Sequence, residues 1–214
     1  MNPTPVPPAT AVATPDGVLA FWLGACPPDD AAALSLQRQW FTKSDAFDAR
    51  IRARFAPTIE AALAGRLDDW AREPLGWLAL VVVLDQFTRN VFRGTPRSFA
   101  GDSQARALAE QGLARGWDRQ LCWLARPFVL LPLEHAEDLA AQDDCVARFT
   151  ALCAEARADA PPEVQQTLAG NLDYAERHSD VIRQFGRFPH RNAVLARDST
   201  PQEQSYLAQP GAGF

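Results

Sequence analysis

The sequence PLGWLALVVVLDQFTRNVF, at residues 74–92, contains the longest apolar run of the chain, from Trp77 to Leu84. A run rich in valine is typical of a β-strand. Here, however, apolar residues continue to Phe92 without a turn signal, and a continuous pattern of this length favours a buried helix. We therefore predict a central helix over residues 74–92, followed by a break at Gly94-Thr95-Pro96.

Helix patterns with recognisable ends surround this central stretch. Apolar residues recur every three or four positions between a capping residue and a glycine, which is typical of amphipathic helices. The predicted helices run from Thr14 to Gly24, from Ser44 to Gly65 with a kink at Pro57, from a cap at Asp102 to Gly116, over residues 133–158 as one or two helices, from Pro161 to Gly186, and from a capping box at Thr200-Pro201-Gln202-Glu203. No alternating strand pattern recurs. We predict an all-α protein of successive antiparallel helix pairs, in a bundle or solenoid.

Length and composition limit the class of protein. A chain of 214 residues is suited to one core, so we expect a flexible proline-rich arm at residues 1–15 and a single domain over residues 16–214. Residues 1–15 lack the basic start and apolar stretch of a signal peptide, and no run is long enough to cross a membrane. The net charge of −5 argues against general binding to nucleic acids. Four cysteines without a CxxC pair suggest reduced thiols in a cytoplasmic protein.

The first segment with unusual polarity is Asp85–Asn90, at the end of the most apolar helix. Asp85 and Arg89 are four residues apart and share a helix face, as do Gln86 and Asn90. Polar groups on a buried helix need partners, because each unpaired one costs about 1–3 kcal/mol. The segment is either the polar floor of a binding site or an ion pair and amide lock between helices.

The second segment, Glu134-His135-Ala136-Glu137, follows Pro132. Glu134 and Glu137 are three residues apart and lie on one helix face, whereas His135 points elsewhere. The two carboxylates are suited to general acid and base roles. Alternatively, they complement the dipole of a helix in its first turn.

The third segment is Arg187–Asn192, which follows the predicted helix end at Gly186. Its loop presents Arg187, His190, Arg191 and Asn192, and guanidinium groups are suited to carboxylate or phosphate. The alternative is a structural role, in which the arginines cap helix ends or pair with acidic residues. A buried Asp85 would need such a partner, so we predict that the three segments meet in space.

The sequence offers no cofactor or metal motif. His135, His178 and His190 are the only histidines, and their spacing is not that of a zinc site. Phosphate-binding loops, dinucleotide-binding turns and serine hydrolase elbows are absent. We therefore expect no cofactor and no metal.

Five stretches resemble a known family: LDQFTRN at residues 84–90, PLEHAE at 132–137, FGRFPHRN at 185–192, RDSTPQE at 197–203 and WFTKSDAFDARIRARF at 40–55. They resemble the bacterial family called domain of unknown function 924, over nearly everything from about Val18 to Phe214. This resemblance implies an all-α fold similar to tetratricopeptide-repeat proteins. The family pattern often has proline at the position of Thr88 and serine at that of Ala136, so a hydroxyl role beside His135 is not available here. The family brings no established activity.

Three functions are compatible with these observations. The first is recognition of a small anionic ligand or a carboxylate-bearing peptide end in a polar cleft. That cleft would be formed by Asp85, Gln86, Arg89, Asn90, Glu134, His135, Glu137, Arg187, His190, Arg191 and Asn192. The second is a hydrolase or transferase with Glu134, Glu137 or His190 in acid–base roles. The third is a scaffold that binds a partner helix or peptide. We expect neither a nucleic acid nor a membrane as partner.

Overall fold

Only helices and their connections occur in residues 11–213, the part of the chain that the computed structural model describes, with the side chain of Phe41 excepted. This confirms the predicted all-α class. Residues 1–10 of the predicted arm lie outside the described residues. None of the helices in residues 11–213 is both long and apolar enough to cross a membrane.

Contacts divide the chain into two units, Met1–Arg93 with Arg97–Pro132, and Gly94–Pro96 with Leu133–Phe214. The single domain predicted for residues 16–214 stays a prediction. The first unit contains α1 (Pro15–Leu23), α2 (Asp30–Phe41), α3 (Asp45–Leu63), α4 (Pro74–Val82), α5 (Thr88–Val91), α6 (Asp102–Ala114) and most of α7 (Arg126–Glu134). Short 3-10 turns, η1 (Asp68–Arg72), η3 (Pro96–Phe99) and η4 (Trp117–Gln120), connect them.

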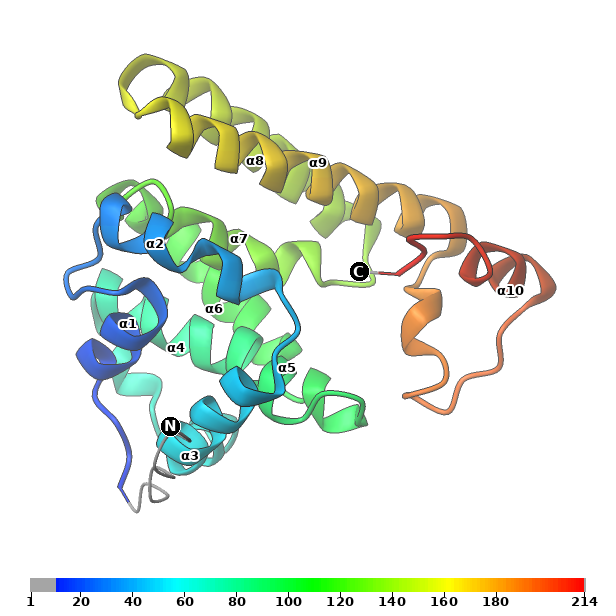
Figure 1. The fold of residues 1–214 in the computed structure, drawn as a ribbon, viewed down its shortest axis with the longest axis horizontal. Coiled ribbons are helices and arrows are strands. Elements are labelled where there is room, and N and C mark those ends of the chain that lie inside the picture. The colour runs from blue at the N-terminus through cyan, green and yellow to red at the C-terminus, as the bar shows by residue number, and fades with distance from the viewer. Residues whose placement is uncertain (1–10, 214) are drawn as a thin grey trace, which may run out of the picture. The chain divides into compact units, whose positions relative to one another are not determined.

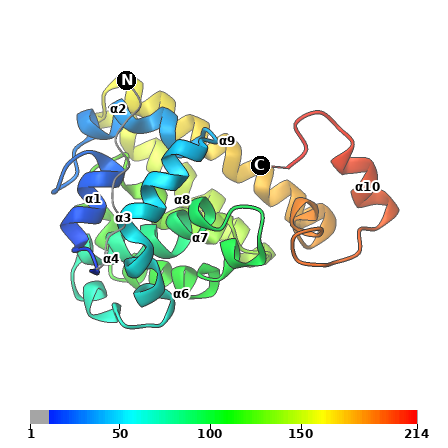
Figure 2. The same cartoon turned by 60° about the horizontal axis from the view of Figure 1, so that its bottom comes forward.

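The predicted central helix is present, with one local change. It consists of α4, a π-helical turn η2 (Val83–Phe87) and α5. Both α1 and α6 pack on α4, and α3 packs on η2 and α5 (Figure 2). Burial on all sides explains why a valine-rich run forms a helix here, because tertiary packing outweighs β-propensity. Aromatic rings complete this core: the Trp22 ring lies 5.6 Å from both Phe87 and Phe128.

The helix ends follow local sequence in most places. Thr14, Ser44 and Thr200 cap α1, α3 and the last helix through their hydroxyl groups, as predicted. The prediction for Asp102 was wrong: Gly101 occupies the N-cap of α6, and Asp102 is the first helical residue. The carboxylate of Asp102 is instead bonded to Arg89, which a helix pattern alone does not reveal.

The second unit is built on a long helix pair, α8 (Leu139–Asp159) and α9 (Pro162–Phe185), which lie side by side in Figure 1. Ala160 and Pro161 connect them, so the two helices are antiparallel. After Gly186 the chain forms the short turn η5 (Pro189–Arg191) and then α10 (Pro201–Leu207). Val181, Ile182 and Phe188 form a small core there, against which Phe185 and Tyr206 pack. One such pair matches the predicted architecture, and the closer likeness to tetratricopeptide repeats stays a prediction.

Candidate functional site

The segment Asp85–Asn90 forms a polar network within the first unit. Asp85 is 0% exposed, and its Oδ1 lies 3.0 Å from Arg89 Nη1, while Gln86 Nε2 donates to Oδ2 at 2.5 Å. Arg89 also donates two hydrogen bonds to Asp102, at 2.8 and 3.0 Å. The arginine that neutralises Asp85 therefore comes from the next turn of the same helix. These contacts fit the internal lock given as the alternative to a site, and a role of this segment in binding stays a prediction.

Asn90 and its neighbour Arg93 extend the network to α3. Asn90 Nδ2 donates to Asp48 Oδ1 at 2.7 Å, and Arg93 Nε donates to Asp48 Oδ2 at 2.9 Å. The side chains of this segment thus connect α3, the π-helical turn and α6. Each has a partner inside the first unit, which is how buried polar groups are accommodated in a core.

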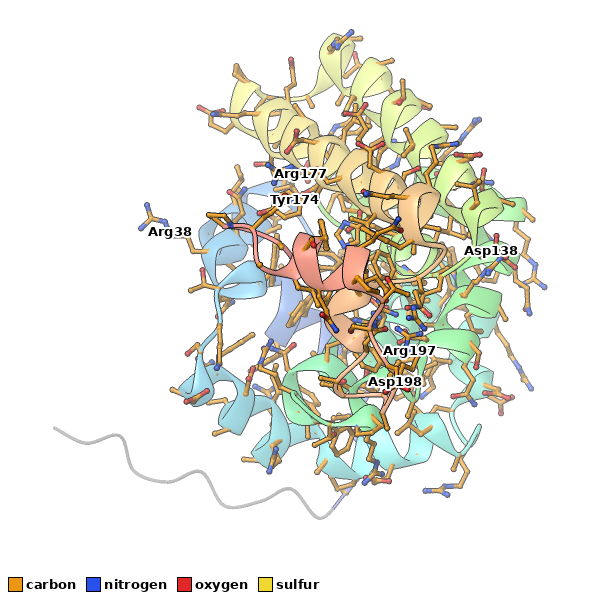
Figure 3. All side chains as sticks on the ribbon, turned by 90° about the vertical axis from the view of Figure 1, so that its right-hand side faces the viewer. Arg38, Asp138, Tyr174, Arg177, Arg197 and Asp198 are labelled. Carbon is orange, nitrogen blue, oxygen red and sulfur yellow. The ribbon has the colours of Figure 1, made fainter. Side chains whose placement is uncertain are left out.

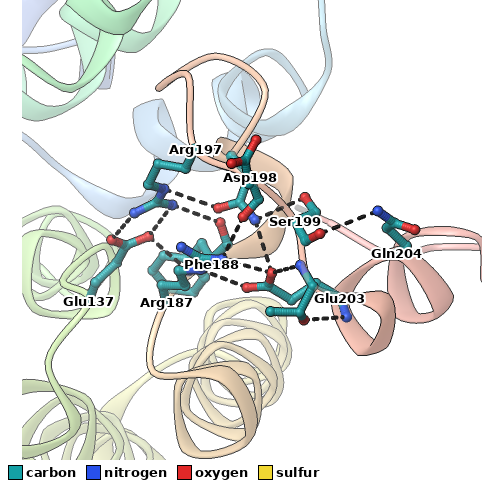
Figure 4. Close-up of polar contacts among 10 residues, drawn as sticks. Glu137, Arg187, Phe188, Arg197, Asp198, Ser199, Glu203 and Gln204 are labelled. Carbon is teal, nitrogen blue, oxygen red and sulfur yellow. Dashed lines mark hydrogen bonds and ion pairs between the residues drawn. The ribbon is translucent and has the colours of Figure 1, made fainter.

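The other two predicted segments meet in the second unit, where Glu137 is held firmly (Figure 4). Arg197 donates two hydrogen bonds to its carboxylate, at 2.6 and 2.9 Å, and the Phe188 N–H donates a third at 2.8 Å. Burial acts to raise the pKa of Glu137, but the hydrogen bonds from Arg197 and Phe188 outweigh it, so this pKa lies below its ordinary value.

Arg187 is bonded to α10 (Figure 4). Its Nε and Nη2 donate to the two carboxylate oxygens of Glu203, at 2.6 and 2.8 Å. Asn192 Nδ2 donates to the same carboxylate at 3.3 Å. The hydrogen bonds from Arg187 lower the pKa of Glu203 to about 2. Arg187 and Asn192 therefore hold the loop around η5 to α10. Asp85 and Arg187, which the sequence suggested as partners, are bonded instead to Arg89 and to Glu203.

The three histidines of the protein lie close together, two of them against Phe188. The His178 ring centroid lies 6.4 Å from that of His135 and 5.5 Å from that of Phe188. Phe188 also lies 5.6 Å from the His190 ring, and the Arg191 guanidinium carbon lies 4.4 Å from the Phe188 centroid. We call His135, His178, His190 and Arg191 the histidine–arginine cluster.

His178 has a defined tautomer. Its Nδ1 lies 2.8 Å from the Tyr174 carbonyl oxygen and 3.4 Å from Glu134 Oε1. A carbonyl oxygen only accepts, so Nδ1 carries the proton and Nε2 keeps a lone pair. Tyr174 itself lies on the outer face of α9 with Arg177, whereas Arg197 and Asp198 lie on the loop before α10 (Figure 3).

The cluster keeps His178 and His190 neutral at physiological pH. Burial is the main cause that lowers the pKa of His178 to about 3, and its neighbours His135, His190 and Arg191 lower it further. Burial likewise lowers the pKa of His190 to about 4, with a further contribution from Arg191. His178 and Arg191 are buried, whereas His135 and His190 are partly exposed. His135 and His190 are therefore the more accessible members of the cluster.

Sequence analysis missed three residues of this site. His178 was not assigned to it, although it follows Ala175 by three residues on the buried face of α9. Arg197 and Glu203 stand in the RDSTPQE stretch and were assigned no partner. The dipole interpretation of Glu134 and Glu137 was wrong, because Glu134 ends α7 and Glu137 lies in the connection before α8. The meeting of Asp85–Asn90 with the other segments stays a prediction.

The neutral state of His178 makes stability depend on pH. Its pKa is about 3 in the folded protein, against an ordinary 6.5. The stabilisation that comes from the neutral form is therefore complete above pH 6.5 and is lost as pH falls toward 3. From pH 6.5 to pH 5, His178 alone should lower the free energy of unfolding by about 2 kcal/mol, at roughly 1.4 kcal/mol per pH unit. Urea denaturation across this range measures the effect.

The variant His178→Asn is the control for this pH dependence. Its amide keeps a donor for the Tyr174 carbonyl but does not titrate, so the dependence on pH should become shallower by that amount. An equally steep dependence in the variant would assign the pH effect to other groups.

Among the side chains that the structure describes, no group of three or more His, Cys, Asp and Glu residues has a geometry that could hold a metal ion. The four cysteines, two of them buried, form no disulfide. The cluster is thus described by its hydrogen-bond donors and its charge rather than by metal-ligand geometry.

Comparisons place these features in a wider context. The profile of a family described as bacterial protein of unknown function (DUF924) matches residues 18–211. A solved structure of a protein of unknown function from Agrobacterium tumefaciens, ATU0120, is 35% identical and superposes with a TM-score of 0.74, over 92% of this chain and 97% of that one. No curated protein matches significantly.

Proposed function

The chain belongs to the DUF924 family of bacterial proteins of unknown function, and we propose that it binds a small organic anion through a carboxylate group at the histidine–arginine cluster. The binding groups are ring nitrogens of His135 and His190, the two partly exposed histidines, together with Arg191 and His178 of the same cluster. We place this binding in the cytoplasm, where four cysteines without a disulfide would stay reduced.

The groups beside His190 that lower its pKa, in an otherwise acidic unit, carry this proposal. In the second unit, thirteen acidic residues outnumber seven arginines. Even so, His190 lies near Arg191, His135 and Arg197, and each of them lowers its pKa. Glu137 acts in the opposite direction, but Arg197 and the Phe188 N–H already occupy its carboxylate. A carboxylate bound beside His190 would relieve this repulsion and accept hydrogen bonds from the imidazole N–H.

The same pKa values favour binding over acid–base catalysis. A general base is most effective when its pKa lies near the working pH. His178 and His190, with pKa values of about 3 and about 4, are neutral but weak bases at pH 7. Glu137 is held ionised by Arg197 and has no proton to give. Neutral imidazoles remain good hydrogen-bond donors, which is what recognition of an anion needs.

The proposal is tested by NMR of the histidine rings, since three histidines give three sets of signals. Acetate, inorganic phosphate and N-acetyl-alanyl-alanine are titrated separately at constant ionic strength, with chloride as the reference anion. We expect acetate or the dipeptide to move the His190 and His135 signals saturably. Because the bound negative charge favours the imidazolium form, the pKa of His190 should rise by roughly one unit on saturation. Response to the dipeptide alone would identify a peptide end as the ligand.

His190→Ala is expected to weaken carboxylate binding roughly tenfold while the fold is kept, because His190 is partly exposed. Arg177→Ala is the matched control in the same unit, since Arg177 is 60% exposed and pairs with Asp173 on α9. The Arg177→Ala variant should bind the carboxylate with the affinity of the wild type. Signals that respond to chloride and carboxylate alike, or equal affinity in all three proteins, would show the proposal to be wrong.

A further inference from the structure

The chain that follows α10 does not run into solvent but turns back in both Figure 1 and Figure 2. Three hydrogen bonds hold this return: Gln209 N–H to the Tyr206 carbonyl at 3.0 Å, Ala212 N–H to the Gln209 carbonyl at 3.2 Å, and Gly213 N–H to the Tyr206 hydroxyl at 3.5 Å. The Tyr206 ring is itself held against Phe185, with centroids 5.2 Å apart. The end of this return is therefore attached to Tyr206, which packs against the small core of the second unit.

The end of this return lies against His190. A Cβ atom built on Gly213 would lie 3.2 Å from His190 Cβ, 3.6 Å from Cγ and 3.9 Å from Nδ1. Gly213 thus lies beside His190, with the direction of its missing side chain toward the base of the imidazole. Gly213 and Ala212 are themselves partly buried, whereas residues 208–211 are exposed.

We propose that residues 208–213 form a cover that controls access to the histidine–arginine cluster, closed when Gly213 lies on His190 and open when the segment lifts away. This inference rests on the proposed anion binding at that cluster. An anion that approaches His190 from the side of Gly213 must displace the segment. The open–closed equilibrium of the cover therefore reduces the apparent affinity of the cluster for the anion. The few hydrogen bonds and exposed backbone of residues 208–211 are typical of segments that open locally.

Glycine is required at position 213 for the closed state. Its φ of +86° is a left-handed conformation that alanine adopts only at a cost, and a Cβ there would press on His190. Gly213→Ala should therefore shift the equilibrium toward the open state without a change in the cluster itself. Gly170→Ala, in α9 with open space around the added methyl, is the matched control.

The experiment measures how fast diethyl pyrocarbonate modifies each histidine at pH 7, with the sites resolved by mass spectrometry. His190 is neutral at this pH, so its rate reports accessibility rather than protonation. We expect His190 to react about tenfold faster in Gly213→Ala, the effect of disfavouring one backbone conformation by the ordinary left-handed penalty. His178, which is buried, should stay slow in every variant. Tyr206→Phe, which removes the hydroxyl acceptor and keeps the ring, should change the His190 rate in the same direction.

Acetate titration of the same variants completes the test. A faster His190 reaction together with tighter acetate binding in Gly213→Ala supports the cover. A His190 rate equal to that of the wild type in both Gly213→Ala and Tyr206→Phe overturns the cover, whatever acetate does. A faster His190 reaction without acetate binding in any variant supports the contact but overturns its role in anion access, together with the proposed function.

Discussion

Replacement of Arg89 by alanine is expected to lower the free energy of unfolding by about 3–5 kcal/mol, the cost of removing one partner from a buried ion pair. Asp85 is 0% exposed, and its Oδ1 lies 3.0 Å from Arg89 Nη1. The same guanidinium is bonded to Asp102 on α6. Without Arg89, two carboxylates lose their shared counter-charge at the centre of the first unit. Chemical denaturation followed by circular dichroism measures the loss.

Arg93→Ala is the control for this prediction. Arg93 is also bonded to an aspartate, Asp48, but its side chain is 41% exposed. Exposed pairs contribute about 0–1 kcal/mol, so this variant should unfold almost like the wild type. If the two variants lost equal stability, burial would not be what makes the Arg89 network important. We expect acetate binding at the histidine–arginine cluster to survive in folded Arg89→Ala, because the network belongs to the first unit and the cluster to the second.

Gly112→Ala is expected to lower the free energy of unfolding by about 3 kcal/mol, although alanine is the better helix former. Gly112 is buried in α6, and an added Cβ would lie 2.1 Å from Cε2 of the Trp77 indole. The indole cannot easily move, because its Nε1 donates to the Leu108 carbonyl at 2.6 Å and the side chain is 1% exposed. The steric penalty should therefore exceed the gain of about 1 kcal/mol in helix propensity.

Gly170→Ala is expected to stabilise the protein. Gly170 lies inside α9 with nothing within 4 Å of an added Cβ, so alanine should raise the free energy of unfolding by about 0.5–1 kcal/mol. Thermal unfolding of both variants measures the contrast. Destabilisation by both substitutions would mean that a property of glycine other than the indole contact decides the result at position 112.

The two polar networks differ in what they can do. In the first unit, Asp85, Arg89, Asn90 and their partners connect helices and are satisfied within the core. In the second unit, Arg187 and Arg197 are used in the same structural way, on Glu203 and Glu137. His135 and His190 are the partly exposed members of the proposed site. We therefore expect the site and the structural network to differ in exposure rather than in residue type.

Local signals in the sequence predicted most of the helices and one of the contacts, but not α2 (Asp30–Phe41) or the end of α7 at Glu134. Caps and glycine stops predicted most helix ends, since capping depends on residues within one turn. The Asp85–Arg89 pair was predictable for the same reason, because residues four apart on a helix are neighbours. The π-helical turn was not, since it arises where α3 and α6 pack on the central helix.

The histidine–arginine cluster was decided by the tertiary structure. Glu137 and Arg197 are 60 residues apart in sequence, and Arg187 and Glu203 are 16 apart. Their meeting depends on the antiparallel return of α9 along α8 and on the turn after Gly186, so no local spacing indicates it. The pKa values of His178 and His190 depend on burial and on these distant charges. In the sequence, His135, His178 and His190 are three isolated histidines. In the folded protein they form one group near Phe188, because packing and desolvation act between residues that only the fold makes neighbours.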